Sequence, residues 1–248
     1  MTTKPSVIDS VRALTEPIGG VGGMWMLHPE VLGPCRDAGY PNGYAYYIAG
    51  RGGVLGDVDA DVVTSAFGFF DPALVRKMWE SGIAVEGARA AGARYAAACA
   101  QFGRTRLQAF GAAGRLAELA GKVADGVDCT GLALFAAWRA EPRPDDAEAR
   151  AFLLMHVLRE LRGSVHIVAV VASGLHPRDA VLASGGAPHG KQFGWPEPYP
   201  EVQRTAKNAA EALTDTVLAG LYAAVLDADE AAELVSLVTS LRALVGGH

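Results

Sequence analysis

The sequence has few of the features that mark disulfide-bonded, metal-binding or membrane-spanning proteins. Its three cysteines are Cys35, Cys99 and Cys129, and no two of them have a metal-binding spacing. We therefore expect three free thiols, as is usual in a reducing compartment. No stretch approaches the ~20 uncharged apolar residues of a membrane span. Even the most apolar segment, residues 152–172, is interrupted by charged residues and histidines.

Positive charge is also scarce. There are 22 Lys and Arg against 27 Asp and Glu, and the net charge is −5. An acidic surface repels phosphate backbones, so DNA binding would need a local basic patch. The N-terminal residues 1–10 lack the layout of a signal peptide. Together these observations predict a cytoplasmic protein without a membrane partner, for which DNA is an unfavourable partner.

Half of the 248 residues are hydrophobic, and alanine, the best helix former, is abundant. A chain of this length buries a large core. We therefore predict an all-α, multi-helix globular domain. Helices are expected over residues 7–14, 42–49, 59–67, 84–101, 107–124, 129–140, 145–173 with a kink or break at 163, 177–184, 201–226 and 228–245. Two further helices are expected to begin at residues 28 and 71.

Glycine and proline predict where the helices stop. The cluster from Gly19 to Gly23 should end the first helix, and residues 185–200, with four glycines and four prolines, should form a loop. The Pro142 and Pro144 pair is the best internal boundary. It divides the chain into an N-terminal subdomain, residues 1–140, and a C-terminal subdomain, residues 141–248, which we expect to pack as one unit.

A polar stripe runs along the predicted helix from Phe152 to Ser173. His156, Arg159, Arg162 and His166 fall within a sector roughly 120° wide. Two arginines beside two histidines are suited to holding a carboxylate or phosphate. Alternatively, the stripe faces solvent or pairs with acidic residues of a neighbouring helix. Apolar residues occupy the rest of the circumference, so we expect this helix to be buried, including Val168 and Val171.

A metal site has little support. His156 and Glu160 have a usable i, i+4 ligand spacing, but no HExxH or CxxC motif is present. A neutral histidine on a largely apolar helix is more often a structural hydrogen-bonding group. We predict no metal, and the sequence does not identify a cofactor.

A cluster of aromatic residues occurs in a different part of the chain. Tyr44, Tyr46, Tyr47 and Arg51 precede three phenylalanines, Phe67, Phe69 and Phe70. Tyrosines join an apolar ring to a polar tip and suit pocket walls. Ordinary core packing is the other interpretation, above all for the phenylalanines.

A helix-turn-helix pattern is centred on Gly174. Two predicted helices, residues 166–173 and 177–184, flank the turn Gly174-Leu175-His176. This spacing is typical of DNA-binding modules, and it is also simply how two helices are joined.

Several blocks of the sequence resemble a poorly characterised actinobacterial family labelled helix-turn-helix, of winged-helix, MarR-like type. The blocks are Ala49-Gly50-Arg51, Leu55-Gly56, Asp71-Pro72-Ala73-Leu74-Val75, residues 158–166, Gly194-Trp195 and Thr214-Asp215. Leu161 and Ser164 depart from the family pattern. The resemblance implies a wing between Gly194-Trp195 and Thr214-Asp215, but no Leu-Thr-x-x-Gly wing is present there. The wing is therefore apparently deleted, which leaves a degenerate helix-turn-helix.

These observations favour a small-molecule-binding protein or enzyme of actinobacterial specialised metabolism that has lost DNA binding. The alternatives are a ligand-responsive MarR-like regulator and a purely structural or partner-binding helical protein. We expect the candidate residues to converge on one polar pocket that binds an anionic ligand. Alternatively, the arginines there form only internal salt bridges. The candidate site residues are Tyr47, Arg51, His156, Arg159, Arg162 and His166. A homodimer is expected through Leu213, Val217, Leu221, Val225, Leu234, Val238 and Leu241.

Overall fold

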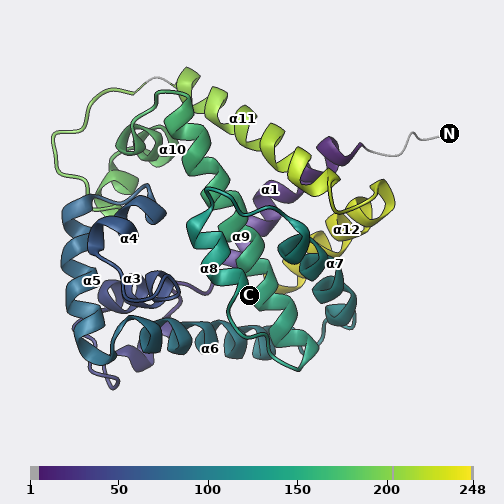
Figure 1. The fold of residues 1–248 in the computed structure, drawn as a ribbon, viewed down its shortest axis with the longest axis horizontal. Coiled ribbons are helices and arrows are strands. Elements are labelled where there is room, and N and C mark those ends of the chain that lie inside the picture. Colours follow the sequence, from purple (N-terminus) through teal and green to yellow (C-terminus); the bar gives the residue numbers. More distant parts are fainter. Residues whose placement is uncertain (1–5, 203, 247–248) are drawn as a thin grey trace.

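The computed structural model describes residues 6–202 and 204–246. Residues 1–5, the first half of the segment that lacks the layout of a signal peptide, lie outside the described residues. The described residues form twelve α-helices and one short 3-10 helix, and they contain no strand (Figure 1). The predicted all-α fold is confirmed. The helices are α1 Val7–Gly23, α2 Pro29–Leu32, η1 Gly33–Cys35, α3 Gly43–Gly53, α4 Ala60–Phe67, α5 Pro72–Glu86, α6 Ala88–Arg106, α7 Ala113–Gly126, α8 Ala133–Arg139, α9 Ala147–Ala172, α10 Pro177–Gln192, α11 Arg204–Ala223 and α12 Ala228–Val245.

The longest helix, α9, lies at the centre of the molecule and contacts α1, α6, α7, α8 and α11 (Figure 1). It begins after the Pro142 and Pro144 segment, where the Asp146 side chain accepts a hydrogen bond from the backbone N–H of Ala149. Gly163 neither kinks nor ends it. No residue in its first two thirds is exposed, so the residues that α9 carries are positioned by helices on several sides.

The hydrophobic core includes residues from both predicted subdomains. One cluster of buried side chains extends from Val11 in α1 to Val245 in α12, and it includes Trp138 before the Pro142 segment and Phe152 after it. The division at residue 140 stays a prediction, and the core is continuous across it.

The prediction that the Gly19–Gly23 cluster ends the first helix is wrong, because α1 runs through it to Gly23. The reason is close packing between helices. A Cβ atom at Gly22 would lie 2.5 Å from the carbonyl oxygen of Met155 in α9, so only glycine fits. Gly19 and Gly20 face open space.

The predicted loop over residues 185–200 is also partly wrong. Helix α10 continues to Gln192, with non-helical backbone only at Gly185 and Gly186, where Gly186 has φ 62° and ψ −153°. Pro188 falls in the first turn after this kink, where its missing N–H is not needed. The irregular segment therefore begins at Phe193, and the second half of α10 is brought back onto the body of the protein.

The expected burial of the C-terminal end of α9 is wrong. Val168 is 51% exposed and Val171 is 65% exposed. These turns project beyond the main core, where α10 and α11 cover α9 on one side only. On the open side, Val168 and Val171 border a shallow apolar groove together with Val62 of α4.

The two C-terminal helices, α11 and α12, form close to their predicted positions. Leu234, Val238 and Leu241 are buried in the chain's own core, so they offer no surface to a second copy. Leu213 and Val217 remain exposed, and the dimer prediction now depends on them. Within the described residues, no single helix is long and apolar enough to cross a membrane; the bent pair α11 and α12 passes by length and composition alone.

Candidate functional site

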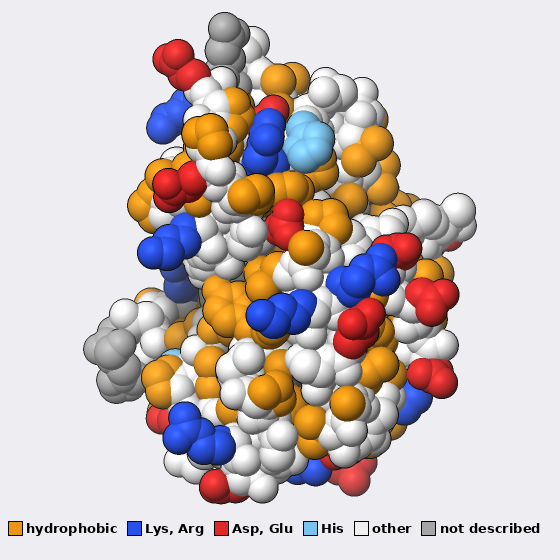
Figure 2. All heavy atoms as spheres, turned by 90° about the vertical axis from the view of Figure 1, so that its left-hand side faces the viewer, with side chains coloured by type: hydrophobic (Ala, Val, Ile, Leu, Met, Phe, Trp, Pro, Cys, Tyr) orange, Lys and Arg blue, Asp and Glu red, His pale blue; other side chains and the backbone are white. Residues whose placement is uncertain are grey.

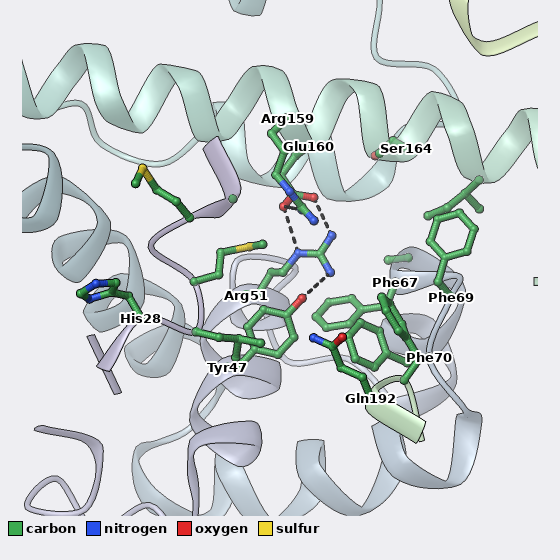
Figure 3. Close-up of a pocket in the computed structure, with 18 of the residues that line it drawn as sticks. His28, Tyr47, Arg51, Phe67, Phe69, Phe70, Arg159, Glu160, Ser164 and Gln192 are labelled. Atoms are coloured by element: carbon green, nitrogen blue, oxygen red, sulfur yellow. Dashed lines mark hydrogen bonds and ion pairs between the residues drawn. The ribbon is translucent and has the colours of Figure 1, made fainter. Parts of the chain in front are cut away.

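A cavity of about 560 Å³ lies between α9, α3 and the end of α10 (Figure 3). Most of its wall is apolar or aromatic, and polar groups gather at the end where α3 faces α9. The lining residues that matter below are Met26, Tyr47, Arg51, Phe67, Phe69, Phe70, Arg159, Glu160, Ser164, Ile167, Gln192 and Phe193.

Glu160 of α9 and Arg51 of α3 form a bidentate ion pair at the polar end. Arg51 Nε donates to Glu160 Oε1 at 2.9 Å and Nη2 donates to Oε2 at 2.8 Å. Arg51 Nη1 donates to the Tyr47 hydroxyl, one helical turn earlier, at 3.1 Å. The guanidinium also lies 4.4 Å from the centre of the Phe67 ring. All of these groups are buried, so their geometry is fixed before any ligand arrives.

Arg159 places a second guanidinium on the same carboxylate. Its Nη1 donates to Glu160 Oε1 at 2.7 Å, and its side chain is 26% exposed. Burial alone would raise the pKa of Glu160, but the attraction of Arg51 and Arg159 outweighs it and holds that pKa well below its usual range. Two cations thus share one anion, which leaves a net positive charge at the polar end of the cavity.

His156 lies behind Glu160 and does not line the cavity. Its ring lies against Trp25 and Trp138 in edge-on contacts. Nδ1 is 3.0 Å from the carbonyl oxygen of Gly22 and 3.4 Å from Trp25 Nε1, an N–H donor. Nε2, 3.5 Å from Glu160 Oε1, has no hydrogen-bond partner among the described residues. Burial lowers the pKa of His156 to about 4, so the ring is neutral near pH 7.

Arg162 and His166 lie outside the cavity and form a second cluster with α11. Arg162 Nη2 donates to Glu211 Oε2 at 2.8 Å. His166 Nδ1 is 2.8 Å from the Thr214 hydroxyl, and Nε2 is 3.6 Å from Glu211 Oε1. The prediction of a single pocket is therefore wrong for these two residues, because α11 covers their side of α9 while α3 covers the side of Glu160.

The structure thus brings Tyr47, Arg51 and Arg159 together at the cavity, with His156 one layer behind. Sequence reasoning missed Ser164 as a lining residue. It lies one turn after Glu160, so it shares that face of α9, and it is one of the two positions that depart from the family pattern. It also missed Gln192 and Phe193, because they follow the kink of α10 in a segment predicted to be a loop.

The wall formed by the end of α10 is tied to neighbouring segments by three hydrogen bonds. The Tyr44 hydroxyl donates to the carbonyl of Gln192 at 3.1 Å, and the N–H of Asp71 donates to the carbonyl of Phe193 at 2.8 Å. Trp195 Nε1 donates to the carbonyl of Phe69 at 2.9 Å. This wall of the cavity is therefore held in place by hydrogen bonds to α3 and to the connection between α4 and α5.

A model of a helix-turn-helix family matches residues 10–205, most of the chain. The matched part includes every cavity residue named above. No curated protein and no solved structure matches the chain. Among the described residues, no group of three or more His, Cys, Asp or Glu side chains is arranged to hold a metal ion.

Proposed function

For this chain, which belongs to the helix-turn-helix family, we propose a role in binding a small organic molecule in the cavity between α3, α9 and α10 rather than in binding DNA. One observation carries the proposal: a preformed, largely apolar cavity has a buried and positively charged polar end. Its volume of about 560 Å³ is within the ~300–1,000 Å³ range of small-molecule sites.

The buried charges at the polar end of the cavity disfavour folding, and a role in ligand binding would explain why they are present. Burying charged groups disfavours folding unless they are well paired, and apolar replacements of similar volume are often at least as stable. Arg51 and Glu160 satisfy each other, but Arg159 adds a second cation at the cavity. An apolar wall that meets an excess of positive charge is the arrangement expected for an amphiphilic ligand.

The features that would contact DNA are weak, in support of the loss of DNA binding. A winged helix carries a β-hairpin wing, and the described residues contain no strand. On the face shown in Figure 2, Lys and Arg side chains are interspersed with Asp and Glu, and hydrophobic side chains gather between them. No basic stripe that could follow a phosphate backbone is seen on this face.

A neutral fluorescent probe, N-phenyl-1-naphthylamine, tests the proposal without assuming a charged ligand. We expect saturable binding with one site per chain. Ala66→Trp should abolish it by filling the cavity, because Ala66 lines the wall. Ala98→Trp is the matched control, since Ala98 lines a separate groove. Absence of saturable binding, or equal binding by both variants, would contradict the proposal.

A ligand-responsive regulator is the second candidate, and α10 favours it. The first half of α10 follows the turn after α9, as the second helix of a helix-turn-helix does, and its second half carries Gln192 to the cavity. A ligand would thus contact the same helix that would face DNA. A gel shift with the upstream region of the protein's own gene separates the candidates: retardation that changes on adding the probe would favour the regulator.

A further inference from the structure

We infer that the cavity takes a hydrophobic monocarboxylate, with the carboxylate among Tyr47, Arg159 and Ser164 and the apolar body against the phenylalanines. The inference rests on the proposed function and specifies the chemical class of its ligand. It follows from which hydrogen-bonding groups the protein leaves unused at the polar end.

The hydrogen-bond acceptor at this end is already occupied. Both oxygens of Glu160 accept hydrogen bonds from Arg51, and Oε1 accepts another from Arg159. The same two arginines keep the carboxylate ionised. A ligand that offered only donors, such as an amine, would have to compete with two guanidinium groups and would meet a net positive charge.

The donors, in contrast, are left over. The Tyr47 hydroxyl accepts a hydrogen bond from Arg51, but among the described residues nothing accepts its own proton, although Tyr47 is only 3% exposed. Ser164 is 7% exposed and has no hydrogen-bond partner within the described part of the chain. Both residues line the cavity, and Figure 3 shows Tyr47 on α3, below Arg51, and Ser164 on α9, beyond Arg159 and Glu160.

Arg159 adds further unused donors. A guanidinium has five N–H groups, and the hydrogen bond of Arg159 to Glu160 uses Nη1 alone. None of these donors is a fully buried atom without a partner, so in the free chain they face the space of the cavity and are available to a ligand. A ligand group made only of acceptors is the group that matches these donors.

Charge restricts this group to a monoanion. Arg51, Arg159 and Glu160 sum to one net positive charge, and His156 behind them is neutral because burial holds its pKa at about 4. One carboxylate balances that charge and accepts several hydrogen bonds through two oxygens. A phosphate monoester would bring a second negative charge next to Glu160, and no further Lys or Arg lines the cavity. The remaining basic side chain there, His28, uses Nδ1 to accept the N–H of Glu30, as a neutral ring does.

The remainder of the cavity selects an apolar body. Phe67, Phe69, Phe70, Phe193 and Ile167 line it. The rings of Phe70 and Phe193 have centroids 4.6 Å apart, which joins the α4–α5 connection to the end of α10. A volume of about 560 Å³ far exceeds a carboxylate alone, so the body must be extended or fused rather than a short acid.

Displacement of N-phenyl-1-naphthylamine measures the preference directly. Matched probes share one body and differ in the head: 2-naphthoate, 2-naphthalenemethanol and 2-naphthalenemethylamine, with decanoate, decanol and decylamine as the aliphatic set. We expect each carboxylate to bind at least about tenfold more tightly than its alcohol, and the amines to bind most weakly. The comparison of the two sets then shows whether the body is aromatic or aliphatic.

Variants assign the effect to the unused donors. Ser164→Ala and Arg159→Gln should each weaken carboxylate binding by roughly 10–100-fold relative to binding of the neutral probe, as for a lost charge-assisted hydrogen bond. Arg162→Gln is the matched control, because Arg162 is on the same helix but pairs with Glu211. Melting curves confirm that each variant is folded.

The outcomes separate this inference from the proposed function. If the wild-type chain binds the neutral probe in the cavity but binds the alcohol or amine as tightly as the carboxylate, the monocarboxylate inference is overturned and the cavity role stands. If the neutral probe does not bind at all, the proposed function itself fails. Equal losses in Arg162→Gln and Arg159→Gln would also overturn the assignment of the head group.

Discussion

At the scale of single residues, the buried ion pair between Arg51 and Glu160 makes a sharp prediction about stability. Arg51→Met leaves a buried carboxylate without its bidentate partner, and Glu160→Leu leaves a buried guanidinium. Each should lower the free energy of unfolding by about 3–5 kcal/mol. The double variant should recover much of this loss, since neither charge is then stranded. Urea unfolding of the three variants measures the effect.

An exposed ion pair in the same fold provides the control. Arg94 makes bidentate hydrogen bonds to Glu86 at 2.7 Å, but its side chain is half exposed. Arg94→Met should therefore cost less than about 1 kcal/mol. Similar losses in Arg94→Met and Arg51→Met would show that burial does not set the energy of the Arg51 pair.

His156 predicts how stability depends on pH. Burial lowers its pKa from 6.5 to about 4 in the folded chain, despite the attraction of Glu160 and the hydrogen bond to Gly22. Between these two values the unfolded chain binds the proton more readily. Stability is therefore complete above pH 6.5, falls as the pH is lowered towards 4, and loses about 3 kcal/mol in total from this residue.

Unfolding free energies of wild type and His156→Gln from pH 7.5 down to 4.5 check this prediction. The variant should be less stable at pH 7.5 but have a clearly flatter pH dependence. His166→Gln is a useful comparison, because burial also lowers the pKa of His166 and the slope it contributes has the same sign. An unchanged slope in His156→Gln would show that His156 does not supply the pH dependence.

Sequence reasoning identified part of the site at this scale. Tyr47, Arg51 and Arg159 were predicted because large polar side chains in apolar helices are unusual. Arg162 and His166 share their helical stripe but not their environment, since periodicity does not tell which neighbouring helix covers each edge of a stripe. Ser164 is small and common, and only its contact with the cavity distinguishes it.

At the scale of helices, two nearby glycines of α1, Gly22 and Gly20, should respond in opposite ways to substitution by alanine. Gly22→Ala would place Cβ 2.5 Å from the carbonyl oxygen of Met155 and 2.9 Å from Cβ of Arg159, so α1 and α9 must separate. We expect a loss of about 1–3 kcal/mol, as for overpacking in a core. A shift of α9 would also disturb Arg159 and weaken carboxylate binding.

Gly20→Ala is the matched control within the same helix. Gly20 is exposed, and a Cβ atom there meets nothing within 4 Å. Alanine should therefore stabilise the chain by about 0.4–1 kcal/mol through the lower entropy of the unfolded state. Thermal melts of both variants decide the matter. A stabilising Gly22→Ala would contradict the close packing of α1 on α9.

The same helices show where local signals mislead. A run of glycines predicts the end of a helix by propensity, yet in α1 the contact with α9 selects for the absence of a side chain at Gly22. In α10, glycine and proline predict a loop, but only Gly185 and Gly186 leave the helix, and Pro188 is placed where a helix can begin. Tertiary packing overrides propensity in the first case, and the position within the turn decides the second.

At the scale of the whole molecule, the all-helical fold could be predicted because alanine content and hydrophobic periodicity agree along most of the chain. The extent of burial could not be predicted in the same way. Val168 and Val171 continue the apolar pattern of α9 beyond the point where other helices cover it. Leu234 and Val238 were assigned to a dimer surface, but α12 packs against α1 and α7 of its own chain. Which apolar face meets which partner is set by the assembled fold.

The distribution of charge over the molecule leads to the last prediction, that the chain does not bind DNA at moderate salt. Net charge is −5, and two arginines of α9 and α10 are engaged within the chain: Arg178 with Asp179 at 3.0 Å and Arg162 with Glu211 at 2.8 Å. Each phosphate contact requires a free cation and contributes about −0.9 to the slope of log affinity against log salt. With these cations paired internally, we expect neither a measurable slope nor an increase in fluorescence anisotropy of a labelled duplex between about 50 and 200 mM salt.

Asp179→Asn, which frees Arg178, should leave this result unchanged, because one cation does not make a phosphate-binding stripe. Retention of the chain's own upstream DNA at about 200 mM salt, lost on a scrambled duplex, would show that the helix-turn-helix still reads sequence and would favour the regulator over the ligand-binding protein.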